Sequence, residues 1–230
     1  MTEKNIKGRA WSKTEAHSSW QIFKIMSEFV EGFETLNKIG PCISIFGSAR
    51  TKEDNPYYNI TVQTAKRLSE EGFGIISGGG PGIMEAANKG AQLGNSPSVG
   101  LNINLPHEQH YNPYIDKDKL LDFNYFFVRK VMFVKYAQGF VMMPGGFGTM
   151  DEFTEVITLM QTRKSVETPV VLVGKSYWKG LLDWMRNTMC EMENNISMED
   201  LNMLKVYDEP EEVVQYFNDY YREKPLQPNF

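Results

Sequence analysis

Short apolar runs alternate with longer amphipathic stretches along most of this chain. The runs at 42–46, 74–77, 98–103, 123–127, 139–143 and 169–173 predict strands, and the stretches at about 57–71, 82–93, 128–137 and 149–163 predict helices. Strands that alternate with helices in this way are typical of βαβ units, whose strands are parallel. The pattern therefore predicts an α/β fold built on a parallel sheet.

The two ends of the chain extend this pattern. Residues 1–17 are polar and lack periodicity, which predicts a flexible arm, and residues 19–38 follow with the spacing of an amphipathic helix. Near the other end we expect a long helix at 177–192, a short strand at 205–207 and a final helix at 209–221. We expect residues 18–230 to form a single domain with an added N-terminal helix.

Composition narrows the class of partner. The chain has 230 residues, of which 41% are hydrophobic, so it can bury the core of one large α/β domain. Its net charge of −5 and the lack of a long basic run argue against nucleic acid. Two cysteines favour a reducing, cytoplasmic setting, and no apolar run reaches the roughly 18 residues of a membrane span. We therefore expect no nucleic-acid or membrane partner.

The segment Pro144–Glu152, with the sequence PGGFGTMDE, carries the clearest chemical signal. It closes an apolar strand with a glycine-rich turn and opens a helix that carries two carboxylates. Glycines let backbone N–H groups turn toward an anion, and a helix N-terminus adds partial positive charge. Another glycine-rich turn, Gly78–Gly82, follows the strand at 74–77 in the same way. Because ligands bind at the carboxyl ends of parallel strands, we expect the two turns to share one phosphate-bearing ligand.

Each acidic residue after these turns can have either a functional or a purely structural role. Asp151 and Glu152 are adjacent and point about 100° apart on a helix, so one acid rather than a pair is expected to face the ligand. Thr149-x-x-Glu152 also has the spacing of a capping box, in which Glu152 would only satisfy a backbone N–H. Glu85, in the helix after Gly82, has the alternative of a solvated acid that complements the helix dipole.

Three other motifs fail on their spacing. Neither the Gly78–Gly82 turn nor the end of the first strand, Phe46–Arg50, has the Gly-x-Gly-x-x-Gly spacing of dinucleotide-binding proteins. Gly174-Lys175-Ser176 lacks the glycine that a nucleotide triphosphatase loop needs at position 169, which is proline. His107 and His110 are three apart instead of four in an expected loop, so we expect no metal site there.

Arg129 and Lys130 stand where a predicted strand gives way to a helix. Cations at a helix start oppose its dipole, so they call for a partner such as a bound phosphate or a buried carboxylate. Arg129 is the stronger candidate, because its planar guanidinium can bind an oxyanion at two points.

At these residues the chain resembles the LONELY GUY (LOG) family of cytokinin riboside 5′-monophosphate phosphoribohydrolases, often labelled putative lysine decarboxylases. The family's Pro-Gly-Gly-x-Gly-Thr-x-x-Glu motif stands at Pro144–Glu152 without a departure, and its other glycine-rich turn is matched at Gly78–Glu85. The resemblance spans roughly residues 40 to 215.

The resemblance implies a Rossmann-like doubly wound fold, a homodimer or higher homo-oligomer, and hydrolysis of the N-glycosidic bond of a purine nucleoside 5′-monophosphate without a cofactor. The base expected is adenine, with or without an N6 substituent. It implies Arg129 and Glu152 as catalytic residues, Gly145, Gly146, Gly148 and Thr149 as phosphate-binding residues, and Gly47, Ser48, Gly79, Gly80, Met84, Glu85 and Lys130 as nucleotide-binding residues. A nucleotide-binding or sensing protein without turnover is the alternative. The decarboxylase label is disfavoured, because no lysine has a context that marks it as a pyridoxal phosphate ligand.

Overall fold

The fold is described by a computed structural model that covers residues 18–105 and 111–230. The predicted arm at 1–17 and the segment with His107 and His110 lie outside these described residues.

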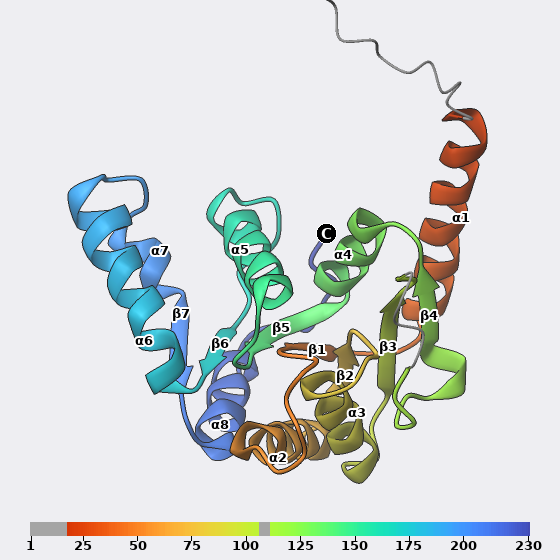
Figure 1. Cartoon of the computed structure of the whole chain (residues 1–230), viewed down its shortest axis with the longest axis horizontal. Helices are drawn as coiled ribbons and strands as arrows, with labels where there is room; N and C mark the ends of the chain where they lie inside the picture. Colours follow the sequence, from red (N-terminus) through yellow and green to blue (C-terminus); the bar gives the residue numbers. More distant parts are fainter. Residues whose placement is uncertain (1–17, 106–110) are drawn as a thin grey trace, which may run out of the picture.

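Seven parallel strands form a single sheet (Figure 1). Their order across the sheet is β4-β3-β2-β1-β5-β6-β7. The strands are β1 (Cys42–Phe46), β2 (Gly74–Ser77), β3 (Ser98–Ile103), β4 (Leu120–Phe123), β5 (Ala137–Met142), β6 (Val170–Val173) and β7 (Leu204–Tyr207). This is the predicted Rossmann-like architecture, in which β1 lies between the two halves of the sheet.

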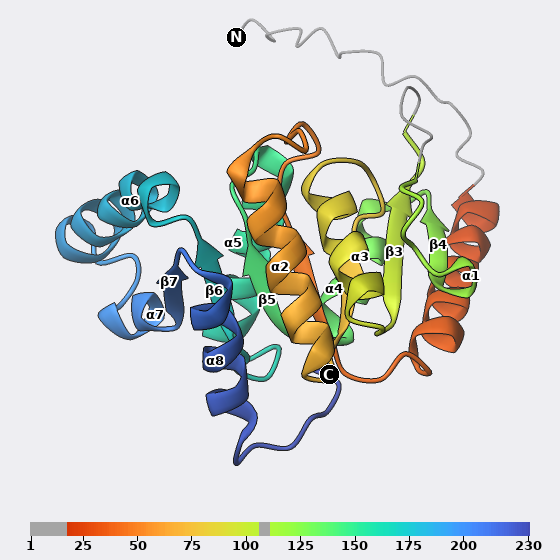
Figure 2. The ribbon, with the colours of Figure 1, turned by 90° about the horizontal axis from the view of Figure 1, so that it is seen from below.

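Helices cover both faces of the sheet, as Figures 1 and 2 show. One face carries α1 (Ser18–Leu36), α4 (Phe126–Lys135), α5 (Phe147–Gln161), α6 (Lys175–Trp184) with its π-helical continuation Met185–Met192, and α7 (Met198–Asn202). The other face carries α2 (Pro56–Glu70), α3 (Ile83–Leu93) and α8 (Pro210–Tyr221). A short 3₁₀ turn, Lys117–Lys119, precedes β4.

Alternation along the central strand explains the two layers. Cys42 and Phe46 of β1 pack in the core beneath α4 and α5, whereas Ile43 and Ile45 pack in the core beneath α2 and α3. Successive side chains of a strand point to opposite faces, and this strand is buried on both. The uninterrupted apolar run in the sequence thus reflects a strand enclosed by helices.

The chain reverses its direction of winding at β1. This strand pairs with β2 on one side and with β5 on the other, both parallel. The connections from β1 to β2 and from β5 to β6 leave toward opposite sides, and in open α/β sheets the carboxyl ends of the strands at such a reversal are where ligands bind. Both glycine turns lie at this edge of the sheet.

The predicted strand at 123–127 is wrong in its position. The strand is Leu120–Phe123, and α4 begins at Phe126 rather than at Val128. Aromatic residues favour strands, but Phe126 and Phe127 are half exposed at the first turn of α4 and belong to no sheet. The predicted helix at 177–192 is likewise divided, since its second half is π-helical, and the short helix α7 was not predicted.

Candidate active site

The turn after β1 joins the two glycine-rich turns. The Ser48 N–H donates to the Pro144 carbonyl at 3.1 Å, and the Ser48 carbonyl accepts from the Ile83 N–H at 3.0 Å. Gly47 packs against Ile83 so closely that a Cβ at position 47 would lie 2.5 Å from it. The predicted residues Gly47 and Ser48 therefore fix the relative position of the two turns.

The helix after the Pro144–Gly146 turn begins earlier than predicted, at Phe147 rather than at about 149. Gly146 is the N-cap of α5, so Thr149 is its third helical residue and the capping box with Glu152 is not formed. The first N–H groups of a helix have no intrahelical acceptor, so those of Phe147, Gly148 and Thr149 are available to an anion. The Thr149 side chain is buried against Gly145, which places its hydroxyl within the same turn.

Arg129 lies close to the Gly78–Gly82 turn and interacts electrostatically with Glu152 of α5. Its Nε donates to the Leu101 carbonyl at 2.8 Å, and its guanidinium lies 5.0 Å from the ring centroid of Phe133. Its Nη2 approaches Gly78 so closely that a Cβ there would lie 2.5 Å away. Burial lowers the pKa of Arg129, and the carboxylate of Glu152 acts in the opposite direction. The two predicted catalytic residues are thus electrostatically coupled.

Glu152 is a buried acid with spare hydrogen-bonding capacity. Its side chain is 8% exposed, and its Oε2 has no hydrogen-bond partner among the described residues. Burial raises the pKa of Glu152 from 4.5 to about 7, although Lys130 and Arg129 favour the ionised form. Buried acids with raised pKa values are frequent in active sites, because desolvation makes them responsive to substrate.

Lys130 of α4 lies close to three acidic residues of α5. Its Nζ lies 2.9 Å from Asp151, 2.5 Å from Glu155 and 3.9 Å from Glu152. Burial lowers the pKa of Lys130, but the hydrogen bonds to Asp151 and Glu155 outweigh it, so the pKa is raised overall. Asp151 is exposed and pairs with Lys130, which leaves Glu152 as the acid directed into the buried part of the site.

Glu85 lies in the first turn of α3, after the first glycine turn, and has a fixed partner. Its Oε1 accepts a hydrogen bond of 2.9 Å from the hydroxyl of Tyr58, a buried residue of α2. Met84, one residue earlier, packs its sulfur and methyl group against Gly78 and Gly80. Met84 therefore packs against the glycine turn, whereas Glu85 is tied to α2.

Sequence reasoning missed several residues that hold the two turns. Asn112 donates to the carbonyls of Gly79 and Gly80, both at 3.1 Å. Tyr177, at the start of α6, donates its hydroxyl to the Gly145 carbonyl. Asn112 stands before a proline, a turn signal that we did not use, and nothing in the local sequence marks Tyr177.

The arrangement combines a helix N-terminus whose first N–H groups are available with a buried acid and a partly buried guanidinium. Such a site can hold a phosphate at one end and stabilise positive charge that develops at the other. Within residues 18–105 and 111–230 there is no group of three or more histidine, cysteine, aspartate or glutamate residues that could hold a metal ion. No helix of the same residues is both long enough and apolar enough to cross a membrane.

Fold and site together define a Rossmann-like α/β protein with two glycine-rich turns at the carboxyl edge of its sheet. Residues 84–217 match the family described as possible lysine decarboxylase. This match covers more than half of the chain, and the protein belongs to that family.

Relatives include plant enzymes of the LOG type. The chain is 29% identical over 118 residues to the cytokinin riboside 5′-monophosphate phosphoribohydrolase LOG of Oryza sativa. This match covers 50% of this chain and 47% of the rice protein. It is 23% identical over 146 residues to LOG3 of Arabidopsis thaliana, covering 62% and 66% respectively. It is 27% identical over 133 residues to an uncharacterized protein of Archaeoglobus fulgidus, covering 57% and 83%. The chain thus matches about half of the rice enzyme's length.

Solved structures share the fold. The molybdenum cofactor carrier protein of Chlamydomonas reinhardtii has a TM-score of 0.58 at 18% identity, covering 80% of this chain and 99% of that one. The molybdenum cofactor binding protein of Rippkaea orientalis has a TM-score of 0.57 at 17% identity, covering 78% and 95%. At such identities the likeness shows the fold alone.

Proposed function

We propose that this protein hydrolyses the N-glycosidic bond of a purine nucleoside 5′-monophosphate, releasing the free base and ribose 5-phosphate. Its substrate is AMP or an N6-substituted AMP. The observation that carries the proposal is Glu152, a buried carboxyl group with an unpartnered oxygen and a pKa raised to about 7, which lies in the second turn of a helix whose N-terminus suits a phosphate. The similarity to the LOG enzymes supports the choice of substrate class.

The phosphate supplies binding energy away from the reacting carbon. Gly145, Gly146, Gly148 and Thr149 bind it through the turn and the first N–H groups of α5. Binding energy at a remote group can be used to orient the sugar for reaction. The nucleoside then lies along Gly47, Ser48, Gly79, Gly80, Met84, Glu85 and Lys130, at the carboxyl edge of β1 and β2.

The reaction replaces the bond from ribose C1′ to the base by a bond to water oxygen. As the C–N bond breaks, its electron pair leaves with the base and positive charge develops on the ribose. The ionised carboxylate of Glu152 stabilises that charge and accepts a proton from the attacking water. The departing base takes up a proton from solvent, and Glu152 returns its proton to solvent, which closes the cycle. Arg129 keeps part of the Glu152 population ionised and contacts the substrate.

The test is release of base by purified protein from a panel of nucleoside 5′-monophosphates, measured by chromatography. We expect turnover of AMP or its N6-substituted forms, and loss of at least a hundredfold in kcat for Glu152→Gln and Arg129→Ala. Circular dichroism of both variants checks that they fold. No release of base from any purine monophosphate would exclude the activity, and calorimetric binding of AMP in that case would support a sensing protein instead.

The same proposal includes a homo-oligomer. The outer stripe of α1 (Trp20, Phe23, Met26 and Val30) is more than half exposed, and exposed apolar patches on this scale mark interaction surfaces. A groove of about 360 Å³ lies between α5 and the α6–α7 region on the same face, lined largely by apolar side chains. Helix α1 and the α6–α7 region stand at opposite ends of that face (Figure 1), so a two-fold axis parallel to the sheet between them would place the stripe of each copy over the groove of the other.

A further inference from the structure

Asn112 makes several hydrogen bonds to the Gly78–Gly82 turn. It is 5% exposed and lies in the loop before β4. Its Nδ2 lies 3.1 Å from both the Gly79 and Gly80 carbonyls, and its backbone N–H donates to the Gly79 carbonyl at 2.8 Å. Two consecutive carbonyls of the turn are therefore directed toward one side chain.

The amide of Asn112 is itself held in one orientation. Its Nδ2 also lies 2.9 Å from Asn88 Oδ1, so its two hydrogens are shared among three acceptors, and its Oδ1 accepts from the Tyr114 N–H at 3.1 Å. Asn88 is fully buried, and its Oδ1 accepts from the Ser77 hydroxyl at 2.6 Å. The Ser77 oxygen in turn accepts from the Gly79 N–H at 3.0 Å. The network closes on the glycine turn from both sides.

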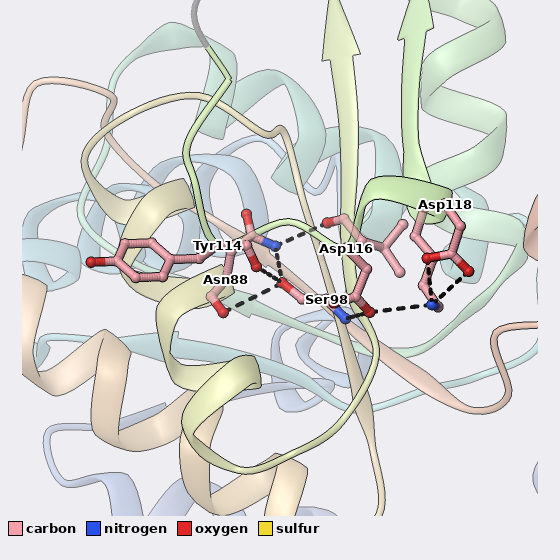
Figure 3. A network of polar contacts seen from close by, with 7 residues as sticks. Asn88, Ser98, Tyr114, Asp116 and Asp118 are labelled. Carbon is pink, nitrogen blue, oxygen red and sulfur yellow. Dashed lines mark hydrogen bonds and ion pairs between the residues drawn. The ribbon is translucent and has the colours of Figure 1, made fainter.

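The loop that carries Asn112 is also anchored to the sheet (Figure 3). The Ser98 hydroxyl donates to the Tyr114 carbonyl at 2.6 Å, and the Ser98 N–H donates to Asp116 at 3.1 Å. The amide of Asn88 donates to the Ser98 hydroxyl at 3.0 Å. Asn112 is thus a rigid donor rather than a mobile loop residue.

We propose that Asn112 is a positioning residue for the nucleotide site. By binding the carbonyls of Gly79 and Gly80 it turns those peptide planes, so that the Gly80 N–H, which has no partner among the described residues, faces the ligand. The turn needs such a clamp because Gly79 has a φ of 77° and glycine peptides reorient easily. This role rests on the proposed function, since it assigns the turn to nucleotide binding.

The test is Asn112→Asp, which keeps the shape but replaces the donating amide with an acid. An ionised carboxyl group would face the oxygens of Gly79, Gly80 and Asn88, so the clamp becomes repulsive. At pH 8 we expect KM for AMP to rise at least tenfold, with kcat changing less than threefold. Burial and the three facing oxygens raise the pKa of the introduced acid, so lowering the pH toward 5.5 favours its protonated, donating form and the KM ratio of variant to wild type should fall. The ratio at each pH cancels the titration of Glu152.

The matched control is Asn104→Asp, an exposed asparagine whose side chain bonds only Asn124 among the described residues. Its KM ratio should stay within twofold at every pH. The proposal is overturned if Asn112→Asp behaves like this control, or if its kcat and KM change together without pH dependence.

A second measurement separates this proposal from the proposed activity. Inactive wild-type protein would exclude the activity, and hydrogen exchange of the peptide over residues 78–82 would then decide the clamp at pH 8. Faster exchange in Asn112→Asp than in Asn104→Asp supports the clamp, and equal exchange overturns it.

Discussion

Glu152, the acid of the proposed reaction, has a cost for folding. Its carboxyl group is buried without a full set of hydrogen bonds, and burial raises its pKa to about 7. In the unfolded chain the same group titrates near 4.5, so the folded state holds a proton over the intervening range. The residue therefore stabilises the fold only while it is protonated.

A first prediction concerns the stability of Glu152→Gln. The wild type loses stability as pH rises from about 4.5 to about 7, and the uncharged variant does not lose this contribution. At pH 8 the variant should be more stable by up to about 3 kcal/mol, and this difference should disappear near pH 4.5. Chemical unfolding at both pH values measures it. A variant that is less stable at pH 8 would show that the acid is satisfied in the fold.

The same titration should govern activity. If the ionised carboxylate reacts, kcat/KM of the wild type should rise with pH along a limb of apparent pKa near 7. A profile that falls with pH through this region would instead assign Glu152 the role of an acid.

Two adjacent glycines at the start of α5 have different structural demands. A Cβ at Gly145 would lie 2.0 Å from the Thr149 hydroxyl, whereas a Cβ at Gly146 would meet nothing within 4 Å. Thr149 is buried in the first turn of the helix, so it cannot move aside freely. Gly145 therefore sets the approach of the turn to the helix, and Gly146 serves as its N-cap.

We predict that Gly145→Ala destabilises the protein by about 1–3 kcal/mol through overpacking at Thr149. Gly146→Ala is the matched control and should cost less than about 1 kcal/mol, since the position has open space. Thermal unfolding compares the two. Equal loss in both variants would contradict the packing argument and point to the backbone of the turn.

Elements enclosed on both faces could be predicted from the sequence, and those on the rim could not. The predicted strands 42–46, 74–77 and 98–103 agree with β1, β2 and β3, because buried parallel strands form continuous apolar runs. The edge strand β4 was misplaced, since exposed Phe126 and Phe127 resemble a strand by composition.

Only those residues of the candidate site that belong to a local sequence motif could be predicted. Two glycine turns and the segment Arg129–Lys130 stand out by spacing and charge, and the structure brings them to one edge of the sheet. Asn112 holds Gly79 from 33 residues away, and Tyr177 holds Gly145 from 32 residues away. Such contacts depend on how the chain folds back, which no local pattern records.

At the scale of the molecule, one face of the sheet has two unmatched apolar surfaces. The outer stripe of α1 and the groove beside α5 are both open to solvent in the single chain. If they pair between two copies, Phe23→Glu should convert the protein from dimer to monomer in light scattering. Leu93→Glu, an equally exposed position on the opposite face, is the control and should leave the mass unchanged. A monomeric wild type would exclude the arrangement.

The place of β1 between β2 and β5 has a consequence for how the protein responds to its ligand. One glycine turn comes from the first half of the chain and the other from the second, and they meet only across β1. A nucleotide bound to both turns would act as a reversible cross-link between the halves. At a ligand concentration of one hundred times Kd, this would add about 2.7 kcal/mol to the free energy of global unfolding. The gain would appear in the slowest-exchanging amides of the central strands, far from the ligand itself.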